Sequence, residues 1–254
     1  MASLPAHDLR DRIARPGVNA LTPFFRKYPC SGPCSLFHMI PRGAFSPDDM
    51  FFYNRIPKAA NTTVARILSE HSSYRRPLAG EGDKHRWLRP PYMSRAQVAA
   101  LESDAVFTFT VVRNPFTRVL SSYQDKILRG PRMERWKHML ELDENGQPSF
   151  LSFCRFLDQG GLYRDAHWAP QSALMLLPLD KFDHICKVES LDADLVTAVQ
   201  RIWGSDGPAE LPRAGNPTNA EEKLRTAYCD KSEALIRKLY AADFAAFGYS
   251  TELL

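Results

Sequence analysis

A lysine and two threonines stand in a short loop of the sequence where a bound anion would meet them. Lys58, Thr62 and Thr63 lie between an apolar run at residues 50–56 and a helical apolar stripe that begins at Val64. Such a strand–loop–helix unit directs free backbone N–H groups and the positive end of the helix dipole at one point. Lysine adds a full charge, and threonine adds hydroxyl donors. The pattern indicates an anion site, although an ordinary strand–loop–helix connection with a surface lysine has the same outline.

An arginine and a serine form a second group of this kind. Arg113 follows a run of β-branched and aromatic residues at 105–112, and Ser121 falls one to two turns into the helix that Pro115 opens. A guanidinium group together with a hydroxyl can bind a second phosphate. The alternative is a strand-end arginine that is paired with an acidic neighbour.

Parallel strands followed by helices are the elements that must position both groups. We expect strands at residues 50–56, 105–112 and 182–188, and a helix that begins at residues 61–63, whose Asn and Thr types suit an N-cap. Ligands of open α/β sheets bind beyond the carboxyl ends of the strands. The predicted fold class is therefore α/β, with a central parallel sheet flanked by helices and both groups on one rim.

Composition narrows the class of protein further. The chain has 254 residues, 44% hydrophobic and 24% charged, which suits one large α/β domain over residues 49–254. Its net charge of +4 suits an anionic ligand but is too small to indicate nucleic-acid binding. No apolar run reaches membrane-span length, so we expect a cytoplasmic protein without a membrane span. Residues 1–48, rich in proline and glycine, are expected to form an irregular arm.

The two motifs together resemble those of sulfotransferases that use 3′-phosphoadenosine-5′-phosphosulfate (PAPS). They read PKAANTT at residues 57–63 and RNPFTRVLSSY at residues 113–123. The resemblance implies a three-layer P-loop-like domain and no metal. It also implies that the first loop binds the 5′-phosphosulfate and that the second motif binds the 3′-phosphate. The implied cofactor-binding residues are Lys58, Ala59, Ala60, Asn61, Thr62, Thr63, Arg113 and Ser121, with Arg213 and Asn216 from a loop that folds over the cofactor.

Further blocks resemble the carbohydrate branch of this family (sulfotransferase family 2). They lie at residues 150–157, 165–171, 182–191 and 240–249. The resemblance implies a glycan acceptor. Departures from the family pattern are Asn61 in the first loop, a local insertion at residues 131–148, and no counterpart of the membrane anchor that Golgi members carry, which favours a bacterial-type enzyme of the cytosol.

The acceptor hydroxyl must lose a proton, and histidine is the side chain best suited to accept it near neutral pH. His85, in a basic loop where related glycan enzymes place a catalytic histidine, is the first candidate, and Lys58 is the expected catalytic cation. His167 and Glu189 are the alternatives for the base. The residues that we expect to touch the acceptor are His167, Trp168, Glu189 and Arg86.

The sequence thus predicts a PAPS-dependent sulfotransferase, with 3′,5′-diphosphoadenosine (PAP) as product and a carbohydrate hydroxyl as acceptor. One alternative is a nucleotide or small-molecule kinase with a variant P-loop, although no GxxxxGK[ST] motif is present. Another is a non-catalytic protein that binds adenine nucleotides or polyanions. All of this requires Lys58 and Arg113 to lie close enough for one nucleotide to bridge them.

Overall fold

A four-stranded sheet is the centre of the protein in a computed structural model that describes residues 9–75, 86–129, 132–204 and 220–253. The strand order is β1-β2-β3-β4, in which β2, β3 and β4 run parallel and β1 is antiparallel to β2. Their bounds are β1 Gly43–Ser46, β2 Phe51–Asn54, β3 Phe107–Val112 and β4 His184–Lys187. The predicted α/β class with a central parallel sheet is confirmed, and β1 is an antiparallel edge that the sequence analysis did not predict.

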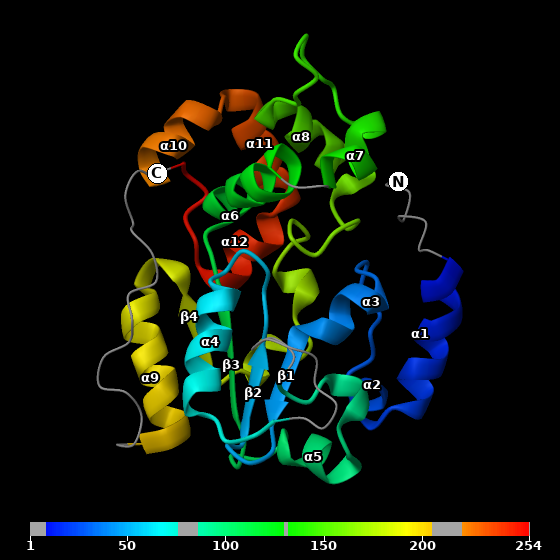
Figure 1. The fold of residues 1–254 in the computed structure, drawn as a ribbon, viewed down its shortest axis with the longest axis vertical. Helices are drawn as coiled ribbons and strands as arrows, with labels where there is room; N and C mark the ends of the chain where they lie inside the picture. Colours follow the sequence, from blue (N-terminus) through cyan, green and yellow to red (C-terminus); the bar gives the residue numbers. More distant parts are fainter. Residues whose placement is uncertain (1–8, 76–85, 130–131, 205–219, 254) are drawn as a thin grey trace.

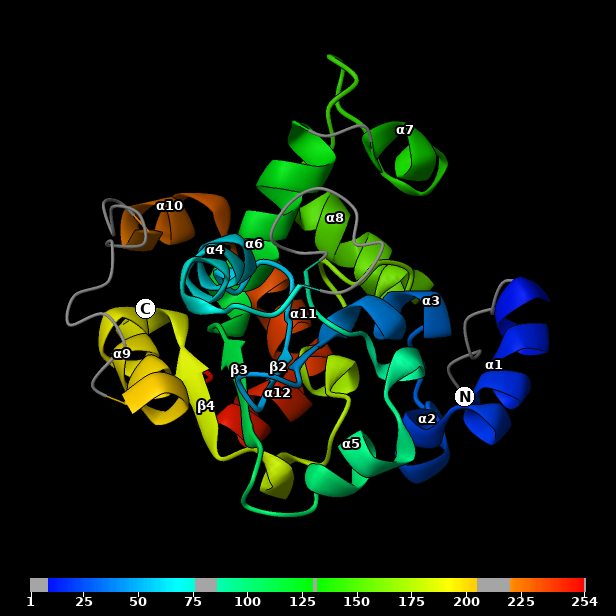
Figure 2. The same cartoon turned by 60° about the horizontal axis from the view of Figure 1, so that its bottom comes forward.

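Helices flank this sheet on several sides (Figures 1 and 2). In both views α9 lies beside the β4 edge, whereas α1, α2 and α5 lie toward the opposite edge. The α-helices of the described residues are α1 Leu9–Leu21, α2 Pro23–Lys27, α3 Leu36–Met39, α4 Asn61–His71, α5 Arg95–Ala100, α6 Pro115–Ser122, α7 Arg132–Trp136, α8 Phe150–Phe156, α9 Leu191–Trp203, α10 Ala220–Ala227, α11 Asp230–Leu239 and α12 Ala241–Phe247. Short 3-10 or π turns join several of them, including a π-helical turn over Tyr123–Leu128 that continues α6.

Strands β1 and β2 and nearly all of β3 are buried, whereas β4 is only partly buried. Phe51, Phe52 and Tyr53 of β2 have no exposed surface, and the ring of Tyr53 stacks on that of Phe109 with centroids 4.8 Å apart. Near-continuous burial of this kind is typical of strands covered on both faces. It leaves only the strand ends to carry chemistry.

A second apolar cluster lies beyond the carboxyl ends of the strands, where α6, α8, α11 and α12 pack together (Figure 1). The stripe predicted for the helix after Pro115 is buried in this cluster. The residues of this stripe are Phe116, Val119, Leu120, Tyr123 and Ile127. The cluster fixes α6, so the residues at the start of α6 and on its outer face are held rigidly above the sheet.

The N-terminal segment differs from the expected irregular arm. Residues 9–46 form α1, α2, α3 and the edge strand β1, and Phe24 stacks on Phe52 of the sheet with ring centroids 5.8 Å apart. Pro23 opens α2 instead of interrupting regular structure, as proline can at a first helical turn. The buried carboxylate of Asp11 accepts hydrogen bonds from Ser35 Oγ and Leu36 N, which joins α1 to α3. This segment is therefore part of the packed structure.

Candidate active site

The loop between β2 and α4 is held in an unusual backbone conformation. Lys58 and Ala60 have φ angles of 67° and 51°, in the left-handed region that costs non-glycine residues roughly 1–2 kcal/mol each. Such strain persists only where neighbouring groups enforce it. Here Arg118 donates to the carbonyl oxygen of Pro57 at 3.0 Å, and Arg113 Nη1 donates to that of Lys58 at 3.4 Å.

Helix α4 begins at Asn61 and has Ala60 as its N-cap residue, with no side-chain capping bond. We had expected an N-cap among residues 61–63, one to three positions later. Because alanine has no side-chain acceptor, Ala60 leaves the positive end of α4 available to an external anion. Ala59, which precedes it, is fully buried and acts only as part of the loop backbone.

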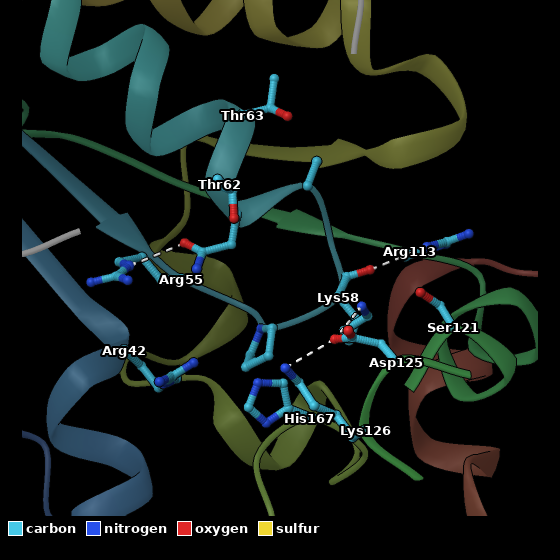
Figure 3. Close-up of a pocket in the computed structure, with 13 residues that line it drawn as sticks. Arg42, Arg55, Lys58, Thr62, Thr63, Arg113, Ser121, Asp125, Lys126 and His167 are labelled. Atoms are coloured by element: carbon cyan, nitrogen blue, oxygen red, sulfur yellow. Dashed lines mark hydrogen bonds and ion pairs between the residues drawn. The ribbon is translucent and has the colours of Figure 1, made fainter. Parts of the chain in front are cut away.

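Beside this loop lies a cavity of about 420 Å³, which we call the cationic cavity (Figure 3). Its lining includes five basic side chains and one acidic side chain. The lining residues are Arg42, Arg55, Pro57, Lys58, Ala60, Asn61, Thr62, Thr63, Arg113, Ser121, Asp125, Lys126 and His167. The two motifs predicted to bind phosphates therefore meet at one cavity, and the separation of Lys58 from Arg113 that would have excluded a shared ligand is not found.

Arg113 follows β3 directly, and its guanidinium lies on one side of the cationic cavity together with Ser121 (Figure 3). Its Nε donates to Thr117 Oγ1 at 2.9 Å, and its backbone N–H donates to Gln171 Oε1 at 2.9 Å. In the described part of the chain no carboxylate is found in a close ion pair with Arg113, although the charge of Glu189 acts on its guanidinium. Burial lowers the pKa of Arg113. A desolvated cation of this kind gains from an anionic ligand.

Arg42 and Arg55 lie on the other side of the cavity (Figure 3). Burial lowers the pKa of Arg42 to about 10, and Arg55 Nε donates to Asn61 Oδ1 at 3.1 Å. The sequence analysis missed both arginines. Arg55 stands only two residues before Pro57 of the first motif, but its direction depends on the register of the strand end. Arg42 comes from the segment that was expected to be irregular.

Asp125 is the acidic member of the cavity, and the sequence analysis missed it too. Its Oδ2 lies 2.9 Å from Lys126 Nζ and 3.0 Å from Lys58 Nζ. The hydrogen bonds from Lys126 and Lys58 hold the pKa of Asp125 at about 2. Its position four residues after Ser121 on the same helical run places it on the same face, and this spacing was the available signal.

His167 lies on the wall of the cationic cavity (Figure 3). Its Nδ1 is 2.7 Å from Oδ1 of Asp165, which is almost fully buried. A histidine held by a buried carboxylate is oriented for chemistry at its other nitrogen. Four residues were expected to touch the acceptor, and of these His167 lines the cationic cavity.

The other expected acceptor residues lie elsewhere. Trp168 has no exposed surface and donates its indole N–H to the carbonyl oxygen of Gly161, so it belongs to the core. Glu189 accepts from the backbone N–H of Asn114 and from the hydroxyl of Tyr249, which makes it a support of the β3–α6 turn. Arg86 Nε donates to the carbonyl oxygen of Tyr74 at 2.6 Å, beyond the far end of α4.

Three predicted site residues lie outside the described residues, namely His85, Arg213 and Asn216. Among the described residues, no group of three or more His, Cys, Asp or Glu side chains is gathered as a metal site would require. No helix found there combines the length and apolar character needed to cross a bilayer.

Comparison with known proteins assigns the class. The model of the sulfotransferase family matches residues 42–250, so the chain belongs to the sulfotransferase family. Carbohydrate sulfotransferase 10 of Rattus norvegicus and of Mus musculus are each 28% identical over 167 residues, 56% of this chain and 47% of the relative. The Xenopus laevis protein of the same name is 26% identical over 171 residues, 58% of this chain and 48% of the relative. The chain spans about half the length of these relatives, and no solved structure matches it.

Proposed function

We propose that this protein transfers the sulfuryl group of PAPS to a hydroxyl group of a carbohydrate. The observation that carries the proposal is the meeting of the 57–63 loop with Arg113 and Ser121 at one cationic cavity. PAPS has phosphate groups at its 3′ and 5′ positions, and a protein that binds both needs two anion sites on one surface. The carbohydrate sulfotransferase relatives support the choice of acceptor class.

In this proposal Arg113 and Ser121 hold the 3′-phosphate, because a guanidinium and a hydroxyl together bind phosphate in a fixed direction. The 5′-phosphosulfate lies against Lys58 and the N-terminal end of α4, near Thr62 and Thr63. The hydrogen bond of 3.4 Å from Arg113 Nη1 to the carbonyl oxygen of Lys58 connects the two proposed anion sites. Arg213 and Asn216 remain predictions as additional contacts to the donor.

Sulfuryl transfer resembles phosphoryl transfer, in that the protein mainly aligns the reactants and neutralises charge. As the bond between sulfur and the bridging oxygen breaks, negative charge grows on the 5′-phosphate of PAP. The Nζ of Lys58 and the helix N-terminus are suited to stabilise that charge. These groups suffice for the charge balance of the transfer without a metal.

Incubation with PAPS labelled in its sulfate, against a panel of glycans and simple alcohols, tests the proposal. We expect label in at least one glycan and PAP as the second product. Arg113→Ala should abolish most of the transfer. Arg155→Ala is the matched control, since Arg155 is partly exposed, pairs with Glu141 and lies outside the cavity.

The alternatives give different results in the same assay. A kinase would transfer phosphate from ATP, which lacks a 3′-phosphate, and would tolerate Arg113→Ala. A non-catalytic binding protein would bind PAP or heparin but transfer label to no acceptor. Membership of the sulfotransferase family favours neither alternative.

A further inference from the structure

One turn of the chain, at residues 165–169, places the imidazole of His167 on the wall of the cationic cavity and a buried carboxylate, that of Asp165, next to it. Asp165 Oδ1 is 2.7 Å from His167 Nδ1 and also accepts the backbone N–H of His167 at 3.0 Å. The side chain of Asp165 is 4% exposed and that of His167 is 26% exposed. The carboxylate is therefore desolvated while the ring reaches the cavity. With Nδ1 donating to Asp165, the lone pair of the ring is on Nε2.

The same turn is fixed to the donor loop by a single buried guanidinium. Arg118, which has no exposed surface, donates to the carbonyl oxygens of Ala169 at 2.8 Å and Ala166 at 3.2 Å. It also donates to the carbonyl oxygen of Pro57, the residue before Lys58, at 3.0 Å. One rigid group thus sets the position of His167 relative to Lys58, as an acceptor-activating group requires.

Helix α6 adds a further restraint on this turn. Ser122 Oγ lies 2.6 Å from the carbonyl oxygen of His167, and the adjacent Ser121 lines the cavity. Neighbouring residues of one helix therefore face the proposed 3′-phosphate site and the histidine turn. The imidazole and the donor site are parts of one preorganised frame.

We propose that His167 is the general base that removes the proton of the acceptor hydroxyl, and that Asp165 is its positioning residue. The inference rests on the proposed function. It also changes the expectation from the sequence, in which His85 was the first candidate for this role.

His167 Nε2 takes the proton of the acceptor hydroxyl as that oxygen forms a bond to the sulfur of PAPS. The bond from sulfur to the bridging oxygen breaks, and its electron pair stays on the 5′-phosphate of PAP, next to Lys58. The imidazolium, stabilised by the Asp165 carboxylate, then releases the proton to water.

Two carboxylates near the site are poorly placed for this role. Asp125 is bound by Lys58 and Lys126, and its pKa of about 2 makes it a weak base. Glu189 is engaged by Asn114 and Tyr249 and does not line the cavity. Among the described residues that line the cavity, His167 is the one histidine and thus the candidate with a suitable side chain for this role.

The test compares His167→Gln and His167→Ala with the matched control His138→Ala, whose residue is exposed and outside the cavity. We expect both His167 variants to lower kcat by about 100-fold or more, the usual contribution of a general base. The dissociation constant of PAP, measured by calorimetry, should change less than about threefold, because the base touches the acceptor and not the nucleotide. His138→Ala should match the unsubstituted protein in both measurements.

Asp165→Asn tests the positioning residue. Asparagine keeps an oxygen for the two N–H groups of His167 and removes the charge that stabilises the imidazolium, a charge that also acts on Arg42. We expect kcat to fall by at least about tenfold with KM nearly unchanged. Added imidazole should partly restore His167→Ala and should not restore Lys58→Ala, whereas a merely structural histidine would give no such rescue.

Several outcomes would overturn the inference. Transfer by His167→Gln at near the unsubstituted rate would exclude the base, as would loss of transfer in His85→Ala with full activity in His167→Ala. Loss of PAP binding in both His167 variants would assign His167 to donor binding or folding. These results leave the sulfotransferase proposal intact, while an unsubstituted protein that transfers no sulfate to any acceptor overturns both proposals.

Discussion

Lys58 Nζ lies 3.0 Å from the Asp125 carboxylate, so the cation expected to meet the donor already has an anionic partner. The same carboxylate oxygen also lies 2.9 Å from Lys126 Nζ. In the proposed function, a phosphosulfate group that enters the cavity competes with Asp125 for these lysines. We therefore expect the negative charge of Asp125 to oppose binding of the donor.

Asp125→Asn should bind PAP more tightly than the unsubstituted protein. The substitution removes a negative charge next to the proposed anion site, and we expect the dissociation constant to fall by roughly 3- to 10-fold, about 0.7–1.4 kcal/mol. Calorimetric titration with PAP measures it. Glu141→Gln is the matched control, because Glu141 is exposed and pairs with Arg155 away from the cavity. Weaker binding by Asp125→Asn would mean that Asp125 organises the lysines more than it repels the ligand.

Asp125 should also contribute a pH-dependent part of the stability. Its pKa falls from 3.8 to about 2 in the folded protein, so the contribution is fully present above the ordinary value and is lost as pH falls toward the folded value. The difference in unfolding temperature between the unsubstituted protein and Asp125→Asn should therefore be constant above about pH 5 and shrink from pH 4 to pH 2. Thermal unfolding across this range measures it. A difference that grows on acidification would contradict the ion pair.

Arg113→Ala should remove the preference for a nucleotide that carries a 3′-phosphate. Loss of charge-assisted hydrogen bonds costs about 1.5–3 kcal/mol, so we expect PAP to bind roughly 10- to 100-fold more weakly. Adenosine 5′-phosphosulfate, which lacks the 3′-phosphate, should bind nearly as it does to the unsubstituted protein. Calorimetric titration of Arg113→Ala and of the unsubstituted protein with each nucleotide measures both dissociation constants. An equal loss for both ligands would place Arg113 at the 5′ end or in the folding of the loop.

Arg118→Leu should destabilise the whole protein. Arg118 is fully buried, and its removal leaves three backbone carbonyl oxygens without their donor, those of Pro57, Ala166 and Ala169. We expect a loss of about 3 kcal/mol or more in the free energy of unfolding. Urea denaturation measures it. The partly exposed Arg155 provides the comparison, and Arg155→Ala should change stability by less than about 0.5 kcal/mol. A similar small change in Arg118→Leu would mean that the loop conformation does not depend on this guanidinium.

Both motif-bearing turns could be predicted from the sequence because their signals are local. The apolar run before Pro57 and the stripe after Pro115 follow strand and helix periods, and β2, α4, β3 and α6 form where these periods occur. Parallel strands place their carboxyl ends on one edge, which is why the 57–63 loop and Arg113 reach the same cavity. Each of these inferences needs only neighbouring residues and a general rule of sheet geometry.

Other features depended on contacts between residues far apart in the chain. Trp168 and His167 are adjacent in sequence, yet the first is in the core and the second is on the cavity wall, because the turn at 165–169 is fixed by Arg118 from α6. Arg113 and Arg118 are both arginines five positions apart, yet the packing of α6 buries Arg118 completely, whereas Arg113 lines the cavity. The antiparallel edge strand β1 likewise depended on pairing with β2.

The sequence by itself thus determined the family, the strand–loop–helix units and the two motifs that meet at the cationic cavity, since local periodicity and short motifs define them. The tertiary structure decided which charges line the cationic cavity and that His167 lies on its wall. The physical reason is that burial and ion pairing depend on distances across the fold: Asp125 acquires its two lysine partners, and His167 its place on the cavity wall, only when separate segments pack together.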